Sequence, residues 1–183
     1  LQFDSQTTSP LALVSNDNAS MLFYVNPGLD SALFEAQDKR LAASLINGSR
    51  ERTYMGKFPN YNPPTQNIPL LRLAEIYLIH AEAEAQTSQS ISDASFNSFK
   101  TVNSRAGLAT PKSDFNSLKT YIKGIQEEKE RELLFEGETW FDYCRTELAL
   151  EKYKNLTDKN YFLYPLPTAQ IALNKQLTQN PGY

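Results

Sequence analysis

The sequence has a single cysteine, a single histidine and a single tryptophan among its 183 residues. One cysteine, Cys144, excludes an internal disulfide and any zinc site built from several cysteines. No apolar run is long enough to span a bilayer as a helix. The net charge of −3 and the lack of a dense Lys/Arg cluster with interleaved aromatics argue against nucleic acid as a partner.

What is present is the composition of an ordinary folded protein. Apolar residues make up 40% of the chain and charged residues 21%, and this length is sufficient to bury a real core. We therefore expect a single domain over residues 1–183, consisting of a loop-rich flank (1–67), helical hairpins (68–151) and a tail (152–183).

The flank is rich in Asn, Ser, Tyr, Pro and Gly and shows little sustained helical period. Within it, the Ala, Leu and Phe content of residues 30–45 predicts one helix, and residues 53–59 predict a short strand or extended segment. The prolines of residues 60–66 predict a loop. At most short β segments are therefore expected.

Residues 69–86 carry the strongest helical pattern, and Pro69 opens it at a position where its missing N–H costs little. Apolar side chains cover most of this helix and leave a narrow polar strip that contains Arg72, Glu75 and Glu82. That strip is a natural partner for charged residues from elsewhere in the chain.

Further helical patterns follow along the chain. Ser92 can cap a second helix that Gly107 stops, so the first two helices are expected to form an antiparallel pair. Residues 113–136, capped by Ser113 and Asp114, residues 139–151 and residues 168–174 predict three more helices. The expected fold is mainly α, with two tetratricopeptide-like helical hairpins, although the strict 34-residue unit is not reproduced.

The run 127–146, EEKERELLFEGETWFDYCRT, places charges where an amphipathic helix would place leucines. At about 100° per residue, the apolar stripe that begins at Leu118 continues into Glu132 and Glu136. Unpaired buried carboxylates are costly, so this face must meet cations. We therefore predict an internal ionic network with these members: Arg72, Glu75, Arg105, Glu132, Glu136, Asp142 and Arg145.

The same carboxylates allow a second interpretation, because glycosidases hold two carboxyl groups roughly 5–10 Å apart. A catalytic pair needs an open cleft, whereas Glu128, Glu132 and Glu136 share a core-facing stripe, so structural pairing is favoured. His80 stands alone on an apolar helix with Glu84 one turn away, and Cys144 has no histidine nearby, so packing is favoured for both. We predict no catalytic residue, no metal and no cofactor.

Four ordered blocks carry a resemblance to a known family. They are IPLLRLAEIYLIHAEAEA, RAGL at residues 105–108, ERELLFEGETWFDYCRT, and LYPLPTAQI followed by NPGY. Together they resemble the C-terminal region of the SusD/RagB family over roughly residues 38–183. The segment KTVNSR at 100–105 departs from the Asn-x-Val-Arg-x-Arg pattern that is common in that family, a change that bears on the ionic scaffold more than on any ligand site.

The resemblance implies a role in nutrient uptake at the cell outer membrane. It implies a surface-exposed lipoprotein that binds an oligosaccharide, or in some members a peptide, and delivers it to a TonB-dependent outer-membrane transporter. The lipid anchor is expected in an N-terminal part that these residues do not include. An alternative is a protein-interaction module that docks onto the transporter or a peptide and has no glycan site. A third hypothesis is that the protein is a hydrolase.

Candidate sugar-binding residues lie in the loop-rich flank, because binding residues tend to sit on loops that a rigid scaffold positions. The proposed set is Tyr54, Phe58, Tyr61 and Asn62, whose rings and amide suit stacking on sugars and bonding to hydroxyls. Packing of these tyrosines onto the helices is the competing interpretation. Trp140 and Phe141 could also stack on sugars, but their place in the FEGETWFD block favours the core.

Overall fold

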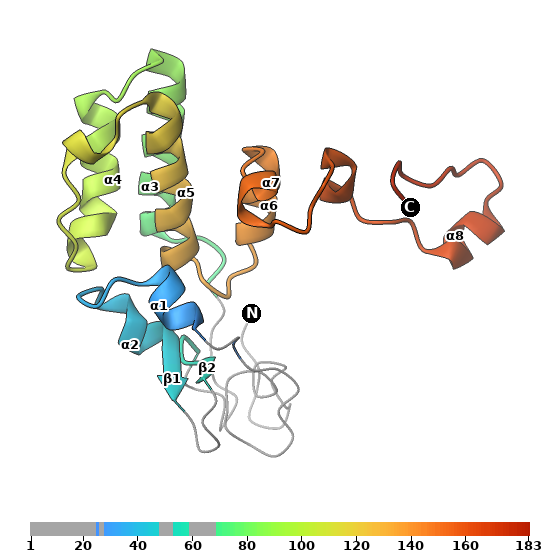
Figure 1. Ribbon diagram of the computed structural model, residues 1–183, viewed down its shortest axis with the longest axis horizontal. Coiled ribbons are helices and arrows are strands. Elements are labelled where there is room, and N and C mark those ends of the chain that lie inside the picture. Colours follow the sequence, from blue (N-terminus) through green and yellow to red (C-terminus); the bar gives the residue numbers. More distant parts are fainter. Residues whose placement is uncertain (1–24, 26–27, 48–52, 59–68) are drawn as a thin grey trace. The chain divides into compact units, whose positions relative to one another are not determined.

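The computed structural model describes residue 25 and residues 28–47, 53–58 and 69–183. Its contacts divide the chain into two compact units, residues 1–137 and 138–183, which are described separately below. The described residues are mainly helical and include one two-stranded sheet (Figure 1). The predicted fold class is therefore confirmed. The assignment of residues 1–183 to a single domain stays a prediction.

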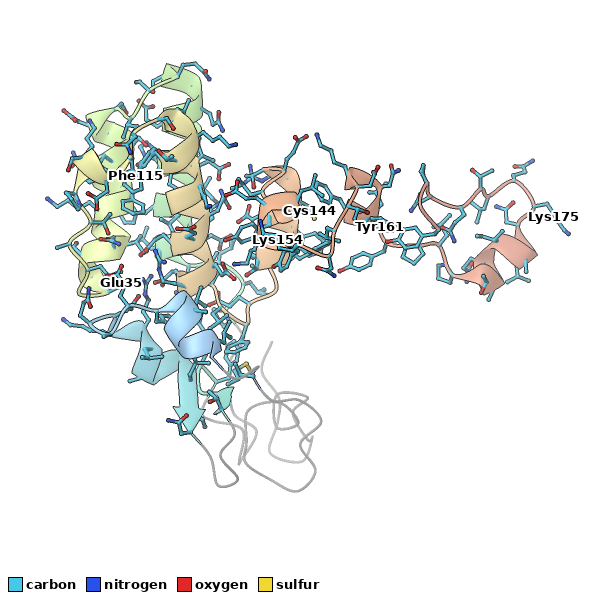
Figure 2. All side chains as sticks on the ribbon, viewed as in Figure 1. Glu35, Phe115, Cys144, Lys154, Tyr161 and Lys175 are labelled. Carbon is cyan, nitrogen blue, oxygen red and sulfur yellow. The ribbon has the colours of Figure 1, made fainter. Side chains whose placement is uncertain are left out.

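Three helices form the centre of the first unit: α3 (Leu73–Ser88), α4 (Asp93–Arg105) and α5 (Leu118–Glu132). They lie side by side, and α3 packs against both α4 and α5 (Figure 1). Tyr121 is fully buried among the aromatic rings of Phe99 and Phe115. Figure 2 shows Phe115 among the side chains of α4 and α5. This apolar cluster holds the bundle together.

The ends of α4 follow the predicted local signals. Ser92 Oγ accepts a hydrogen bond from the backbone N–H of Ser95 at 3.1 Å, which is an N-cap. Gly107 follows the helix with a φ of +88°, a conformation that glycine adopts without a steric penalty. The start and the end of α4 are therefore fixed by residues next to them in sequence.

The third predicted helix, residues 113–136, is shorter than expected. A 3₁₀ turn, η2 (Lys112–Asp114), precedes it, and α5 begins after Ser117, which forms a reciprocal capping box with Thr120. The helix ends at Glu132 because Phe135 has a φ of +67°, which a right-handed helix cannot accommodate. The prediction was wrong at both ends because a nearer cap and a left-handed residue decided them.

The flank folds against the same unit as short elements. They are α1 (Leu29–Leu33), α2 (Arg40–Ser44), β1 (Leu45–Asn47) and β2 (Thr53–Met55), and β1 pairs antiparallel with β2. The single helix predicted over 30–45 is wrong, because Asp38 accepts a hydrogen bond from the backbone N–H of Arg40 and begins a separate helix there. The predicted extended segment is present as β2. The loop predicted over 60–66 lies outside the described residues.

The second unit consists of short helices: α6 (Thr139–Arg145), α7 (Ala149–Lys152), the 3₁₀ turn η3 (Lys159–Phe162) and α8 (Thr168–Leu173). The one helix predicted over 139–151 is two, because Glu147 has a φ of +60° between them. The tail helix is present as α8. Since α6 belongs to this unit, the second predicted hairpin stays a prediction. None of the helices in the described parts of the chain is long and apolar enough to cross a membrane.

Candidate functional site

Charged side chains gather in the first unit around the C-terminal half of α5. They come from α2, from the segment after β2, from the start of α3, from the end of α4 and from α5 itself. We call this group the charge cluster. Its members are Asp38, Arg40, Lys57, Arg72, Arg105, Glu128, Arg131, Glu132 and Glu136.

Glu132 lies at the centre of the charge cluster and meets three guanidinium groups. Its carboxylate accepts from Arg72 Nη1 at 2.7 Å, from Arg105 Nη2 at 2.5 Å and from Arg40 Nη1 at 3.3 Å. Burial raises the pKa of Glu132, but the hydrogen bonds from Arg105 and Arg72 outweigh it and hold the pKa below its ordinary range. Glu132 is therefore a charged carboxylate at neutral pH.

The carboxylate of Glu128 is fully buried, with a side chain that is 0% exposed, as is that of Asp38. It accepts from Arg40 Nη1 at 2.8 Å, from Arg131 Nη2 at 2.8 Å and from Asn103 Nδ2 at 3.4 Å. Arg40 also donates to Asp38 at 2.7 Å, so it joins two carboxylates that are 90 residues apart in sequence. This one guanidinium fastens the flank to α5.

Glu136, which follows the end of α5, and Lys57 are the remaining pair of the charge cluster. Arg72 Nε donates to Glu136 Oε2 at 3.0 Å, and its Nη2 forms an ion pair with Oε1 at 2.8 Å. Lys57 pairs with the same carboxylate. Lys57 Nζ also donates to the backbone carbonyls of Glu132 and Leu134, at 2.7 and 3.1 Å. Carbonyls at a helix C-terminus lack intrahelical donors, so Lys57 and Arg72 satisfy groups that the helix end leaves open. Burial lowers the pKa of Lys57 overall.

A further buried pair joins α5 to α3. Lys129 Nζ donates to Glu82 Oε2 at 3.0 Å, and Gln126 Nε2 donates to the same oxygen at 2.9 Å. Glu82, Gln126 and Lys129 are all buried. The carboxylate-bearing face of α5 thus meets the polar strip of α3, but through Glu82 and Lys129, residues that the predicted network did not include.

The structure brings four of the seven predicted network members together: Arg72, Arg105, Glu132 and Glu136. Asp142 and Arg145 pair with each other at 2.8 Å within the second unit. The side chain of Glu75 makes no ion pair or hydrogen bond with the residues that the structure describes. Sequence reasoning missed the cations Arg40, Lys57 and Arg131. The Asp38-x-Arg40 spacing was the available local signal, but the pattern there predicted only a helix.

Two of the four candidate sugar-binding residues, Tyr54 and Phe58, lie within the described residues. Tyr54 lies in β2, where its backbone pairs with Ile46. Phe58 is only 4% exposed, so its ring packs in the interior of the first unit. Tyr61 and Asn62 lie outside the described residues. A ligand role for Tyr54, Tyr61 and Asn62 stays a prediction, and Phe58 is placed to support the flank rather than to stack on a sugar.

His80 and Cys144, the chemically reactive side chains considered above, lie in surroundings that fit a packing role. His80 Nδ1 lies 2.9 Å from Ser98 Oγ, whereas Glu84, its expected partner, accepts from Ser92. Burial raises the pKa of the Cys144 thiol, which keeps it protonated at neutral pH. Within the ranges that the structure describes, no group of three or more His, Cys, Asp and Glu residues is arranged to hold a metal ion.

Several aromatic rings are in contact in the second unit. Trp140 is partly buried against Tyr153, Phe162 and Tyr164, with ring centroids 5.9–6.5 Å apart. The core position expected for Phe141 is wrong within this unit, because 61% of its surface is exposed. Its neighbour Tyr143 faces the small core of the unit instead.

Two of the comparisons with known proteins give matches, one with a family model and one with solved structures. The model of the SusD family matches residues 42–183. A SusD superfamily protein from Parabacteroides distasonis is similar in structure, with a TM-score of 0.73 and 21% identity over 97% of this chain and 45% of that protein. A SusD-like carbohydrate binding protein from Bacteroides vulgatus gives a TM-score of 0.60 and 25% identity over 75% of this chain and 30% of that one.

A laminarin binding SusD-like protein gives a TM-score of 0.70 and 22% identity over 94% of this chain and 41% of that one. The chain thus spans less than half the length of each of these three structures. The comparison with curated protein sequences gives no match.

Proposed function

The chain belongs to the SusD family, and from this premise we propose that it is part of a protein that binds an oligosaccharide. The family match over residues 42–183 carries the proposal. Two of the similar structures support it, because one is named as a carbohydrate binding protein and another as a laminarin binding protein.

The proposed role of the charge cluster is to position the flank that presents the ligand-binding loops. Arg40 and Lys57 tie α2 and the segment after β2 to α5 through charge-assisted hydrogen bonds, which are shorter and stronger than neutral ones. Tyr54, Tyr61 and Asn62 belong to this flank and are the residues proposed to meet the sugar. A fixed support reduces the ordering that binding would otherwise require.

Binding without catalysis is the proposed activity. Glycoside hydrolysis requires a carboxylic acid that is protonated when it meets the substrate, which needs a raised pKa. The pKa of Glu132 is instead lowered, and Glu128 and Glu136 accept hydrogen bonds from guanidinium groups. Turnover of a glycan that is abolished in Glu132→Gln, with folding intact, would contradict this part of the proposal.

Delivery of the sugar to a TonB-dependent transporter is the proposed cellular role, at the surface of the outer membrane and with a lipid anchor. A pull-down from an outer-membrane extract tests it, with retention of such a transporter as the expected result. Retention of the transporter together with no glycan affinity in the complete protein would favour the alternative, an interaction module that has no sugar site.

Carbohydrate binding is tested by glycan-array screening followed by isothermal titration with laminarin oligosaccharides. The protein from the complete reading frame and the 183-residue chain are compared, because part of the ligand surface is expected outside this chain. Tyr61→Ala and Asn62→Ala should each lower the affinity at least tenfold and leave the far-UV circular dichroism unchanged.

Tyr164→Ala is the matched control, since Tyr164 is an exposed tyrosine of the second unit, and its affinity should equal that of the wild type. Absence of any carbohydrate binding by the complete protein would refute the proposed function.

A further inference from the structure

Asn47, the last residue of β1, is exposed and is followed in sequence by Gly48. No other Asn-Gly dipeptide occurs in the 183 residues. The side chain of an asparagine can react with the backbone nitrogen of the next residue and close a five-membered ring. A glycine in the next position hinders this attack least, because it has no Cβ and its backbone turns most freely.

The position of Asn47 at the end of β1 leaves room for this reaction. Asn47 and Thr53 form the last pair in the register between β1 and β2, two strands that lie side by side in Figure 1. The attack requires rotation about the Cα–C bond of Asn47, and no residue pair of this register lies beyond that bond. A two-stranded hairpin is marginally stable and its ends open first, so the rotation breaks at most the hydrogen bonds of the last pair.

Thr53 places a hydrogen-bond donor on the atom that the reaction would charge. Its Oγ1 donates to Asn47 Oδ1 at 3.3 Å. When a nitrogen attacks the amide carbon, the negative charge develops on Oδ1, and a donor already aimed at that oxygen lowers the barrier. The backbone carbonyl of Thr53 accepts a hydrogen bond from Val25 N–H at 2.9 Å, so Thr53 is also held from its other side.

We propose that Asn47 is a site of spontaneous deamidation that Thr53 promotes. The nitrogen of Gly48 attacks Cγ of Asn47, a bond forms between the two atoms, and the nitrogen loses its proton to water. The bond between Cγ and Nδ2 breaks and ammonia leaves, which gives a succinimide ring. Water then opens the ring at either of its carbonyls and gives aspartate or isoaspartate, so the net reaction consumes water and releases ammonia.

Either product changes the end of the sheet. Each adds one negative charge next to Thr53, in a chain whose net charge is already −3. Isoaspartate also lengthens the backbone by one methylene group directly after β1, and strand pairing depends on backbone register. The modification therefore accumulates in the flank as the protein ages, and it does not depend on carbohydrate binding.

Peptide mapping by mass spectrometry tests the proposal. The protein from the complete reading frame is incubated at slightly alkaline pH and sampled over time, and peptides with asparagine, aspartate and isoaspartate are separated by chromatography. Two exposed asparagines of the same molecule are internal controls. Asn97 lies within α4, whose helical backbone is fixed on both sides of it, and Asn155 is followed by the bulky Leu156.

Asn47 should be converted to aspartate and isoaspartate while Asn97 and Asn155 stay intact. Gly48→Ala should slow the reaction about tenfold, because a Cβ hinders the attack. Thr53→Val removes the hydroxyl and keeps a β-branched side chain, and it should slow the reaction about threefold, as expected for the loss of one hydrogen bond. Thr53→Ser, which keeps the hydroxyl, should react at the rate of the wild type.

Two results would overturn the proposal. The first is an Asn47 that stays intact, or that reacts no faster than Asn97 or Asn155. The second is an equal rate for the wild type and Thr53→Val, which would remove the role of Thr53. In concentrated urea the two proteins should react at the same rate, because unfolding separates Thr53 from Asn47. A difference that persists in urea would contradict an effect of the folded hairpin.

Discussion

The two units of the chain differ in the kinds of residue that they bury. In the first unit, α5 buries five polar or charged residues along with three apolar ones, and the buried carboxylates are held by cations. In the second unit, the buried residues are only Tyr143, Leu148 and Ala149, and the ion pair between Lys159 and Glu147 is exposed at both ends. Charge is part of the interior in one unit and part of the surface in the other.

The difference teaches how each unit depends on its contacts. A buried ion pair contributes little net stability when intact, but removing one partner leaves an uncompensated charge and is costly. An exposed pair is solvated in either state, so its loss matters little. The first unit should therefore be sensitive to single charge changes, and the second should tolerate them.

The largest expected effect is that of Glu132→Gln. The change removes the charge that Arg72, Arg105 and Arg40 share, and it should lower the free energy of unfolding by about 3 kcal/mol, the lower end of the range for breaking a buried pair. The lower end applies because Arg40 keeps Asp38 and Glu128. Urea unfolding followed by circular dichroism at 222 nm measures it.

Glu147→Gln is the matched control in the second unit, since Glu147 and Lys159 are 62% and 56% exposed. It should cost less than about 1 kcal/mol. Trp140, the only tryptophan, reports on the second unit by its fluorescence. Equal losses in the free energy of unfolding for Glu132→Gln and Glu147→Gln would contradict the expected difference in sensitivity between the two units.

The second prediction concerns acid. The pKa values of Asp38 and Glu132 lie below their ordinary range in the folded state, because the hydrogen bonds from arginine outweigh the effect of burial. Between the folded and unfolded values, the unfolded chain binds more protons, so stability decreases as the pH falls. The contribution is complete above about pH 4, near the unfolded values, and is lost as the pH falls through the lower folded values.

The free energies of unfolding of the wild type and of Glu132→Gln should therefore converge as the pH decreases. The reason is that protonation of Glu132 removes the same charge as the substitution does. The measurement is the urea midpoint at a series of pH values from 7 to 2.5. A gap of constant size across this range would mean that the charge of Glu132 is not what the substitution removes.

Local signals predicted much of the fold. The capping serine and the glycine stop of α4 act on neighbouring residues, so the sequence alone placed that helix. The strand β2 and the helix α8 also followed from short patterns. The ends of α5 were misplaced because Ser117 and Phe135 determine them through backbone geometry that composition does not reveal.

The charge cluster could be predicted only in part. The stripe of α5 required buried cations, and Arg72 and Arg105 were identified because they lie on strong helical patterns near it. Arg40 was missed because 88 residues separate it from Glu128, and only the tertiary fold brings the two together. The sugar-binding residues depend on loop positions that no periodic pattern specifies.

The third prediction tests how tightly the first unit is packed. A Cβ at Gly124 would lie 2.5 Å from Phe115 Cε1, and the Phe115 ring is held by Tyr121 and Phe99. Gly124→Ala gains about 1 kcal/mol in helix propensity, but overpacking should cost roughly twice that, for a net loss of about 1 kcal/mol. Urea unfolding at 222 nm checks the net effect. In a Phe115→Leu background, the same change should be neutral or stabilising, and a loss there would point away from the clash.

The smallest expected effect belongs to the second unit. Leu173 is 82% exposed on α8, so Leu173→Ala removes side-chain surface that water already covers. The free energy of unfolding should change by less than about 0.5 kcal/mol, as for other surface substitutions. Trp140 fluorescence during urea unfolding of the 183-residue chain measures this change. A loss above about 1 kcal/mol would show that Leu173 is covered in solution, and the second unit would then have a larger core than Tyr143, Leu148 and Ala149 provide.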